Sequence, residues 1–166
     1  MEDYTAADRA PAGYRPLQFG NDGFIGQNGS IYVDCSGAEP IFGFRVGDRH
    51  CNPMGICHGG WTATVMDMVL PLTARFTVPD LEDHFLLTIS IAVDYLGSAP
   101  LGAWVEGRGQ ILKRTRRMVF IQGLLSVDGV PTARGNGIFK IGPAAPMIRE
   151  LTGVTGDSGG VESPRW

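Results

Sequence analysis

One long helix followed by several strands is the arrangement that this sequence most strongly predicts. From Trp61 to Leu72, apolar residues recur at the i, i+4, i+7, i+8 and i+11 spacing of a single helical face. From Leu87 to Tyr95, apolar and polar residues alternate, as is typical of a half-buried strand. Because helices do not alternate with the later strands, we expect an α+β fold with an antiparallel sheet.

The other strand candidates lie on both sides of the helix. Asp128 and Gly129 predict a tight hairpin between the last two strands. One helix cannot cover both faces of a sheet, so we expect it to lie across one face and a sheet edge to pair with another subunit. The candidate strands are Ser30 to Asp34, Pro40 to Val46, Ala103 to Leu112, Met118 to Val127 and Pro131 to Ile141.

A chain of 166 residues is enough for one domain with a sizeable core. Residues 1–20 and 143–166 show neither helical nor strand periodicity, so we expect an N-terminal arm and a flexible C-terminal tail around a domain at 21–142. Within the arm, Tyr14, Leu17 and Phe19 are the residues most able to pack.

The charge balance excludes some classes of partner. With 14 basic and 17 acidic residues, the formal net charge of −3 provides no global attraction for nucleic acid or an anionic membrane. The most apolar stretch is interrupted by Asp67 and Pro71 and is shorter than the roughly 20 residues of a membrane-spanning helix. The first residues do not resemble a secretory signal. We therefore expect a cytoplasmic protein without nucleic-acid or membrane partners.

The three cysteines, Cys35, Cys51 and Cys57, match no disulfide framework, so we interpret them as free thiols in a reducing compartment. Cys51 and Cys57 form a cluster with His50 and His58, but the cluster lacks the paired spacing of zinc ligands. We expect no metal site.

The segment that leads into the helix contains the residues best suited to chemistry. Gly59 and Gly60 are poor helix formers at a helix start, where bare N–H groups attract negative charge, including the oxyanion of an attacked carbonyl. Asp67 lies at the edge of the apolar face, where an unpaired carboxylate is costly to bury. Two structural alternatives remain open: a tight turn at the glycines, and a structural hydrogen bond or solvent exposure for Asp67.

Helix geometry adds a constraint. Gly59 and Asp67 are eight residues apart, which is about 12 Å along one helix and too far for both to act on one carbonyl. Antiparallel helices of two subunits would bring one residue of each kind together. An enzyme that uses both residues must therefore be at least a dimer.

Two motifs carry a resemblance to a known family: Asn52-x2-Gly55-x2-His58-Gly59-Gly60-x6-Asp67, and the strand end Val93-Asp94-Tyr95-Leu96-Gly97-Ser98-Ala99. Together they resemble the PaaI-type acyl-CoA thioesterases of the hotdog superfamily, over about Ile41 to Ile141. The resemblance implies a curved antiparallel sheet of five to six strands around one central helix, and homodimers often paired into homotetramers. It also implies hydrolysis of acyl-CoA or aryl-acyl-CoA thioesters to free acid and coenzyme A, with no metal or cofactor.

The resemblance also implies catalytic roles. Gly59 would supply an oxyanion-hole N–H, and Asn52 would hold either the thioester carbonyl or the loop that enters the helix. His58 would assist nearby. Asp67 of the partner subunit would act as general base on water or as the nucleophile, and Thr88 would orient that water.

Further residues would contact the substrate. Gly60 would lie in the binding site, and the bulky Trp61 would narrow the acyl tunnel. The basic run at a strand turn supplies Arg114, Arg116 and Arg117, whose forked guanidinium groups suit the phosphates of coenzyme A. A solvated hairpin tip is the structural alternative for that run.

Two other functions are compatible with the same fold. A non-catalytic protein that binds or senses acyl-CoA would not need Asp67. A dehydratase or hydratase acting on acyl thioesters would need a second carboxylate beside His58, and the sequence offers none there. The acyl group stays open among aryl-acetyl, medium-chain and longer chains.

Overall fold

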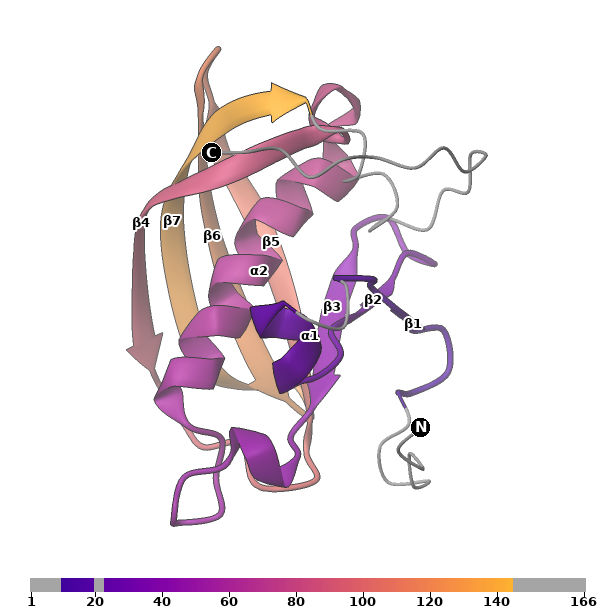
Figure 1. Ribbon diagram of the computed structural model, residues 1–166, viewed down its shortest axis with the longest axis vertical. Coiled ribbons are helices and arrows are strands. Elements are labelled where there is room, and N and C mark those ends of the chain that lie inside the picture. Colours follow the sequence, from indigo (N-terminus) through magenta and orange to yellow (C-terminus); the bar gives the residue numbers. More distant parts are fainter. Residues whose placement is uncertain (1–9, 20–22, 145–166) are drawn as a thin grey trace.

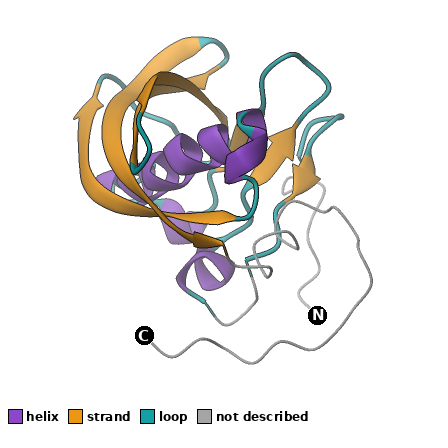
Figure 2. Ribbon diagram, turned by 90° about the horizontal axis from the view of Figure 1, so that it is seen from above, coloured by secondary structure: helices purple, strands orange, loops and turns teal. Residues whose placement is uncertain are grey.

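The computed structural model describes residues 10–19 and 23–144 of the chain. In this part, a seven-stranded antiparallel sheet curves around one long helix, α2 (Gly59–Thr77) (Figure 1). Seen from above, the strands bend around the helix without closing into a barrel (Figure 2). The predicted α+β architecture with an antiparallel sheet and one central helix is confirmed.

The strands follow the order β1-β2-β3-β5-β6-β7-β4, so β1 and β4 are the two edges. The described residues thus form one strand more than the sequence predicts. The strands are β1 (Arg15–Pro16), β2 (Tyr32–Asp34), β3 (Ile41–Arg45), β4 (His84–Tyr95), β5 (Trp104–Arg114), β6 (Met118–Val127) and β7 (Val130–Ala144), and the short helices are α1 (Phe24–Asn28), η2 (Asp48–His50) and η3 (Pro79–Leu81).

The position of β4 differs from a simple succession of neighbouring strands. β5, β6 and β7 form a meander, and Asp128 and Gly129 turn the last hairpin with φ angles of 49° and 78°. β4 does not pair with β5, because β3 already occupies that edge of β5 through pairs such as Phe42 with Gly107. Instead, β4 pairs with β7 at the far side of the sheet. The strand that carries Thr88 is therefore an open edge.

The α2 helix extends beyond the predicted stretch and continues through Pro71 to Thr77. Its sheet-facing side is fully buried, and Met66, Val69 and Leu70 have no exposed surface. Together with Val65 they form the centre of the hydrophobic core against the sheet. The 3.6-residue period therefore predicts the helix but not its whole buried face, because Met66 and Leu70 lie outside the predicted spacing and are fully buried, whereas Met68 is only partly buried.

Glycines in β5, β6 and β7 face α2 and allow the sheet to approach it closely. A Cβ atom on Gly107 would lie 2.7 Å from Val69 Cγ2, and one on Gly135 would lie 2.6 Å from Met66 Cγ. Gly123 has the same relation to a Leu70 methyl group, at 2.8 Å. Side chains at these positions would collide with the helix, so the glycines set the distance between helix and sheet.

Part of the predicted N-terminal arm belongs to the sheet. β1 pairs with β2, and Leu17 is buried in the core. Tyr14 packs edge-on against Trp104, and its hydroxyl donates a hydrogen bond of 2.9 Å to Glu106 Oε1. The expected packing of Tyr14, Leu17 and Phe19 is thus confirmed. At the other end, β7 runs to Ala144, and residues 145–166 of the predicted tail lie outside the described residues.

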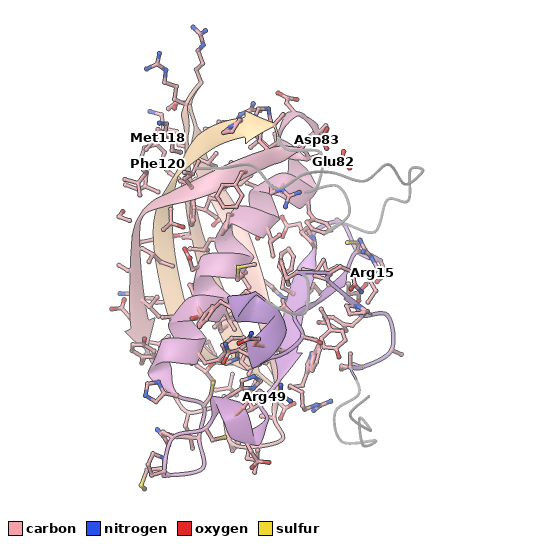
Figure 3. All side chains as sticks on the ribbon, in the orientation of Figure 1. Arg15, Arg49, Glu82, Asp83, Met118 and Phe120 are labelled. Carbon is pink, nitrogen blue, oxygen red and sulfur yellow. The ribbon has the colours of Figure 1, made fainter. Side chains whose placement is uncertain are left out.

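The two ends of α2 can be located in Figure 3 by labelled residues. Arg49 marks the side where the helix begins, whereas Glu82 and Asp83 mark the side where it ends. The turn between β5 and β6 lies on this second side, because Arg114 forms an ion pair of 3.0 Å with Asp80 of η3. None of the helices in the described residues has the length and hydropathy needed to cross a membrane.

Candidate active site

The carboxylate of Asp67 is held by a side chain from the edge strand. Asp67 lies half-buried in the middle of α2, and the Thr88 hydroxyl of β4 donates a hydrogen bond of 2.8 Å to its Oδ1. Thr88 itself is exposed. Among the described residues, no hydrogen bond or ion pair involves Asp67 Oδ2, so this oxygen is free to accept a proton. The structure therefore brings together two of the residues that the sequence analysis selected.

The start of α2 presents a free N–H group. His58 is the N-cap residue, and its Nδ1 accepts a hydrogen bond of 2.9 Å from the Gly60 N–H. Gly59 is the first helical residue, and within the described part of the chain its N–H has no acceptor. The positive end of the helix dipole adds to the attraction for an anion at this point. Gly59 can therefore stabilise an oxyanion, whereas the Gly60 N–H is already used by His58.

Tyr95, at the end of β4, contacts Gly59 through the carbonyl of that glycine. Its hydroxyl donates a hydrogen bond of 2.9 Å to the Gly59 carbonyl, and a Cβ on Gly59 would lie 3.3 Å from the Tyr95 ring. Tyr95 belongs to the strand-end motif, but that motif alone predicts no separate role for its hydroxyl. Its contact with Gly59 spans 36 residues. No local pattern reveals such a contact.

A cavity of about 450 Å³ opens beside the start of α2. Gly59 and Tyr95 line it, but Asp67 does not. The Asp67 carboxylate thus lies outside the cavity that Gly59 lines, as expected for two residues about 12 Å apart along one helix. Other lining residues are Asn52, Cys57, Thr62 and Ser98 on the polar side and Phe44, Val105 and Leu125 on the apolar side.

Asn52 shapes the loop that enters the helix. Its side-chain oxygen accepts a hydrogen bond of 2.9 Å from the Met54 N–H, and its own N–H donates one of 2.9 Å to the Ile56 carbonyl. Gly55 follows with φ of +71°, a value that favours glycine. These contacts agree with the second of the two roles expected for Asn52, that of holding the loop.

Trp61 does not line the cavity. It is 7% exposed and stacks on His50 with ring centroids 4.6 Å apart and an interplanar angle of 2°. Its ring also meets Phe44 edge-on. Because Phe44 does line the cavity, Trp61 supports the wall from behind.

His50 is a buried histidine held in one tautomer. Its Nδ1 accepts a hydrogen bond of 3.0 Å from the Gly47 N–H, so the proton resides on Nε2, which donates to the Asn28 carbonyl. Burial lowers the pKa of His50, and the nearby Arg49 charge lowers it further, while the bond to Asn28 opposes both effects. His50 is therefore a neutral structural group that links α1 to the start of α2.

The turn between β5 and β6, which carries Arg114, Arg116 and Arg117 and is called the basic turn below, lies far from this cavity within one subunit. Arg114 is paired with Asp80 beyond the end of α2, and Arg116 and Arg117 are exposed. The 19 residues of α2 separate this turn from Gly59 by about 28 Å. In the described residues, no group of three or more histidine, cysteine, aspartate or glutamate side chains could hold a metal ion.

Comparisons with known proteins agree with the fold. The mouse thioesterase superfamily member 2 aligns with a TM-score of 0.61 at 23% identity, over 76% of this chain and 99% of that chain. The hypothetical thioesterase protein of Streptococcus pneumoniae TIGR4, solved with coenzyme A, aligns with a TM-score of 0.58 at 15% identity, over 69% of this chain and 90% of that one.

Sequence comparison adds family membership. The model of the thioesterase superfamily matches residues 54–130, which include the start of α2, Asp67 and Thr88. A Caenorhabditis elegans protein, one of two relatives named "putative esterase", is 31% identical over 124 residues, covering 74% of this chain and 72% of that protein. The other, from Pseudomonas aeruginosa, is 25% identical over 132 residues, covering 79% and 96%. The chain therefore belongs to the thioesterase superfamily and has its hotdog fold.

Proposed function

We propose that this protein hydrolyses an acyl-CoA or aryl-acyl-CoA thioester to the free acid and coenzyme A. Membership of the thioesterase superfamily supports a hydrolase, and the similar fold solved with coenzyme A supports this class of substrate. The observation that carries the proposal is the Asp67 carboxylate, oriented by Thr88 at 2.8 Å beside the open edge of the sheet. A protein that only bound acyl-CoA would have no need for an oriented carboxylate.

In the proposed reaction, Asp67 takes a proton from a water molecule as that water attacks the thioester carbonyl. The hydrogen bond from Thr88 leaves Oδ2 of the carboxylate to receive this proton. The negative charge that develops on the carbonyl oxygen is stabilised by the Gly59 N–H and the helix dipole. Collapse of the tetrahedral intermediate breaks the carbon–sulfur bond and releases the coenzyme A thiol.

The site is shared between two copies of the chain. Within one copy, Gly59 and Asp67 are about 12 Å apart along α2, and only Gly59 lines the cavity. The edge strand β4 exposes unpaired backbone together with Ile89 and Tyr95, each 56% exposed. Antiparallel pairing of two β4 strands about a two-fold axis covers this edge and places Asp67 of one copy next to Gly59 of the other. A homodimer is therefore the smallest active form, and its pairing into a homotetramer stays a prediction.

The basic turn fits the same arrangement. Because antiparallel helices run in opposite directions, a partner helix whose Asp67 lies beside Gly59 continues for ten more residues and ends about 15 Å beyond the start of this helix, on the side of the cavity. The turn of the partner is then the one that approaches this cavity. Arg116 and Arg117 are exposed and bear no ion pair in the described part of the chain, so their guanidinium groups are available for the phosphates of coenzyme A.

The proposal is tested by screening coenzyme A thioesters of aryl-acetyl, medium-chain and long-chain acids, with detection of the released thiol. We expect turnover of at least one class, unchanged after dialysis against a chelator. Asp67→Asn should lower kcat by about 100-fold or more, the usual scale for loss of a general base.

The matched control is Asp94→Asn. Asp94 is an exposed carboxylate on β4, the same edge strand as Thr88, and it forms an ion pair of 2.7 Å with Arg134 of β7. This variant should keep nearly all activity, because exposed ion pairs contribute little. Binding of acyl-CoA without turnover by the wild-type dimer would identify a binding protein instead. Equal activity of wild type and Asp67→Asn would remove Asp67 from the mechanism.

A further inference from the structure

Cys51 and Cys57 face each other across the hairpin that precedes α2. The two residues form an isolated antiparallel bridge. On one side of the bridge, the Asn52 N–H donates to the Ile56 carbonyl at 2.9 Å, and on the other the His58 N–H donates to the His50 carbonyl at 2.7 Å. This pattern makes Cys51 and Cys57 a non-hydrogen-bonded pair, whose side chains lie on the same face of the ladder.

The geometry of such a pair is compatible with a disulfide. Opposed residues of this type have Cα atoms about 4.5 Å apart, and disulfides usually join Cα atoms separated by about 4.4 to 6.8 Å. Both thiols are free in the structure. The hairpin therefore places two thiols in reach of each other without a change of fold.

The surroundings of the two sulfur atoms differ. Cys51 Sγ donates to the Gly47 carbonyl at 3.5 Å, whereas Cys57 Sγ accepts a hydrogen bond of 3.5 Å from the Thr62 hydroxyl. Burial raises the pKa of the Cys57 thiol; the Thr62 bond lowers it, and the neighbouring Cys51 thiol raises it. A raised pKa leaves less thiolate at neutral pH, which slows thiol–disulfide exchange.

Small molecules have a path to this pair. Cys57 lines the cavity beside the start of α2, together with Asn52 and Gly59. The third cysteine, Cys35, is exposed in a different part of the fold, just after β2. An oxidant that enters the cavity therefore meets Cys57, with Cys51 as the nearest thiol to complete the reaction.

We propose that Cys51 and Cys57 are a redox-sensitive pair that closes to a reversible disulfide on exchange with a low-molecular-weight disulfide. The Cys57 thiolate attacks one sulfur of the small disulfide, which forms a mixed disulfide and releases the first small thiol. Cys51, after loss of its proton, then attacks Cys57 Sγ, which forms the protein disulfide and releases the second. The protein loses two electrons and two protons, and the small disulfide gains them as two thiols.

Closure alters one wall of the cavity. Cys57 gives up its contact with Thr62, and the hairpin that carries Asn52 becomes covalently closed. This inference concerns the thiol chemistry of the loop and does not depend on the reaction proposed above.

The test uses the full-length chain with Cys35→Ser, which leaves only the two cysteines of interest. The reduced protein is equilibrated in glutathione buffers of increasing oxidised fraction, quenched by alkylation and weighed as intact protein. We expect both alkylation sites to be lost together. The oxidised, unalkylated chain should be about 2 Da lighter than the reduced chain before alkylation, because two hydrogens leave. Peptide mapping should join Cys51 to Cys57, and dithiothreitol should restore both thiols.

The equilibrium constant for closure is then compared between the folded protein and the same chain in concentrated urea. We expect a constant at least about tenfold larger in the folded protein, because the hairpin already opposes the two thiols. Cys51→Ser in the same background should stop at a glutathione adduct on Cys57. Three results would overturn the proposal: both thiols stay alkylatable in the most oxidising buffer, a glutathione adduct persists without ring closure, or the two constants are equal.

Discussion

The hydroxyl of Thr88 lies 2.8 Å from Oδ1 of Asp67 and joins the open edge of the sheet to the middle of the central helix. The two residues are 21 positions apart in the chain. Because Thr88 donates this hydrogen bond, it determines which carboxylate oxygen is left to accept a proton. In the reaction proposed above, this contact would make the position of the carboxylate depend on whatever covers the edge strand.

Thr88→Ala should therefore lower kcat with little effect on KM. A hydrogen bond to a charged group contributes about 1.5 to 3 kcal/mol, which corresponds to about 10- to 100-fold in rate. Thr88→Ser retains the hydroxyl and should restore most of the activity. Steady-state kinetics of the three proteins measures the effect. A serine variant as slow as the alanine variant would show that the methyl group, and so packing, is what matters.

Subunit complementation tests the shared site. Asp67→Asn is mixed with Gly59→Pro, which removes the N–H at the first helical position, where proline is well tolerated. A mixed dimer contains one site with both defects and one with neither, so activity should reappear when subunits exchange. Exchange is followed with differently tagged chains.

Gly59→Ala is the matched control for this experiment. Alanine keeps the backbone N–H, and its Cβ would lie 3.3 Å from the Tyr95 ring. This variant therefore separates the effect of losing the N–H donor from the effect of crowding against Tyr95. The alanine variant alone should keep substantial activity, whereas the proline variant alone should be inactive. If exchange is complete and no activity returns, the two residues do not act across the dimer.

The basic turn should affect only substrates that contain the nucleotide. Replacing Arg116 and Arg117 by glutamine should raise KM for a coenzyme A thioester, while kinetics with a truncated thioester lacking the nucleotide should stay within about twofold. Arg108→Gln removes an exposed arginine of β5 and serves as the control for loss of an arginine elsewhere on the surface. Equal losses with both substrates would assign the turn a structural role.

His50 should make stability depend on pH. The unfolded chain binds a proton at this imidazole below about pH 6.5, whereas the folded protein resists protonation because burial lowers the pKa of His50. The unfolded state then holds more protons, so stability falls as the pH drops below that value and is fully present above it. Each unit of pKa depression corresponds to about 1.4 kcal/mol, or about 3 °C in Tm for a chain of this size.

The measurement is the Tm between pH 7 and pH 5 for wild type, His50→Gln and His84→Gln. We expect the Tm of His50→Gln to be lower at pH 7, because the stacking on Trp61 is lost, and its dependence on pH to be shallower. His84→Gln removes a histidine elsewhere in the fold, whose Nδ1 lies 2.7 Å from the Gly142 carbonyl oxygen, and serves as the control for substitution of a histidine by glutamine. Parallel slopes for all three proteins would assign the pH dependence to other groups.

Local periodicity predicted the elements that bury one regular face. The apolar spacing of α2 and the alternation in β4 are both contained within a single segment, so they are visible without knowledge of the fold. β1 is different, because Arg15 and Pro16 are both exposed and two residues contain no period. It forms because Leu17, next to it, is buried and brings the segment against β2.

In the candidate site, too, some features could be predicted from the sequence and others could not. The spacing of Gly59 and Asp67 follows from helix geometry, so the need for two subunits is an inference from sequence. The contact of Tyr95 with Gly59 depends on how β4 crosses the start of α2. The pairing of Cys51 with Cys57 depends on the hairpin register. Neither contact follows from the spacing of residues in the sequence, because each one joins segments whose relative positions depend on the packing of the fold.

The glycines of β5, β6 and β7 have a consequence for protein engineering. They carry no functional group, yet they determine the depth at which α2 sits and therefore the alignment of its carboxylate with the edge strand. Gly107→Ala would press a methyl group against Val69 from 2.7 Å and push the helix outward by a fraction of an ångström. A hydrogen bond as short as that of Thr88 tolerates little such displacement. Directed evolution of this scaffold can therefore tune turnover from positions that never meet the substrate.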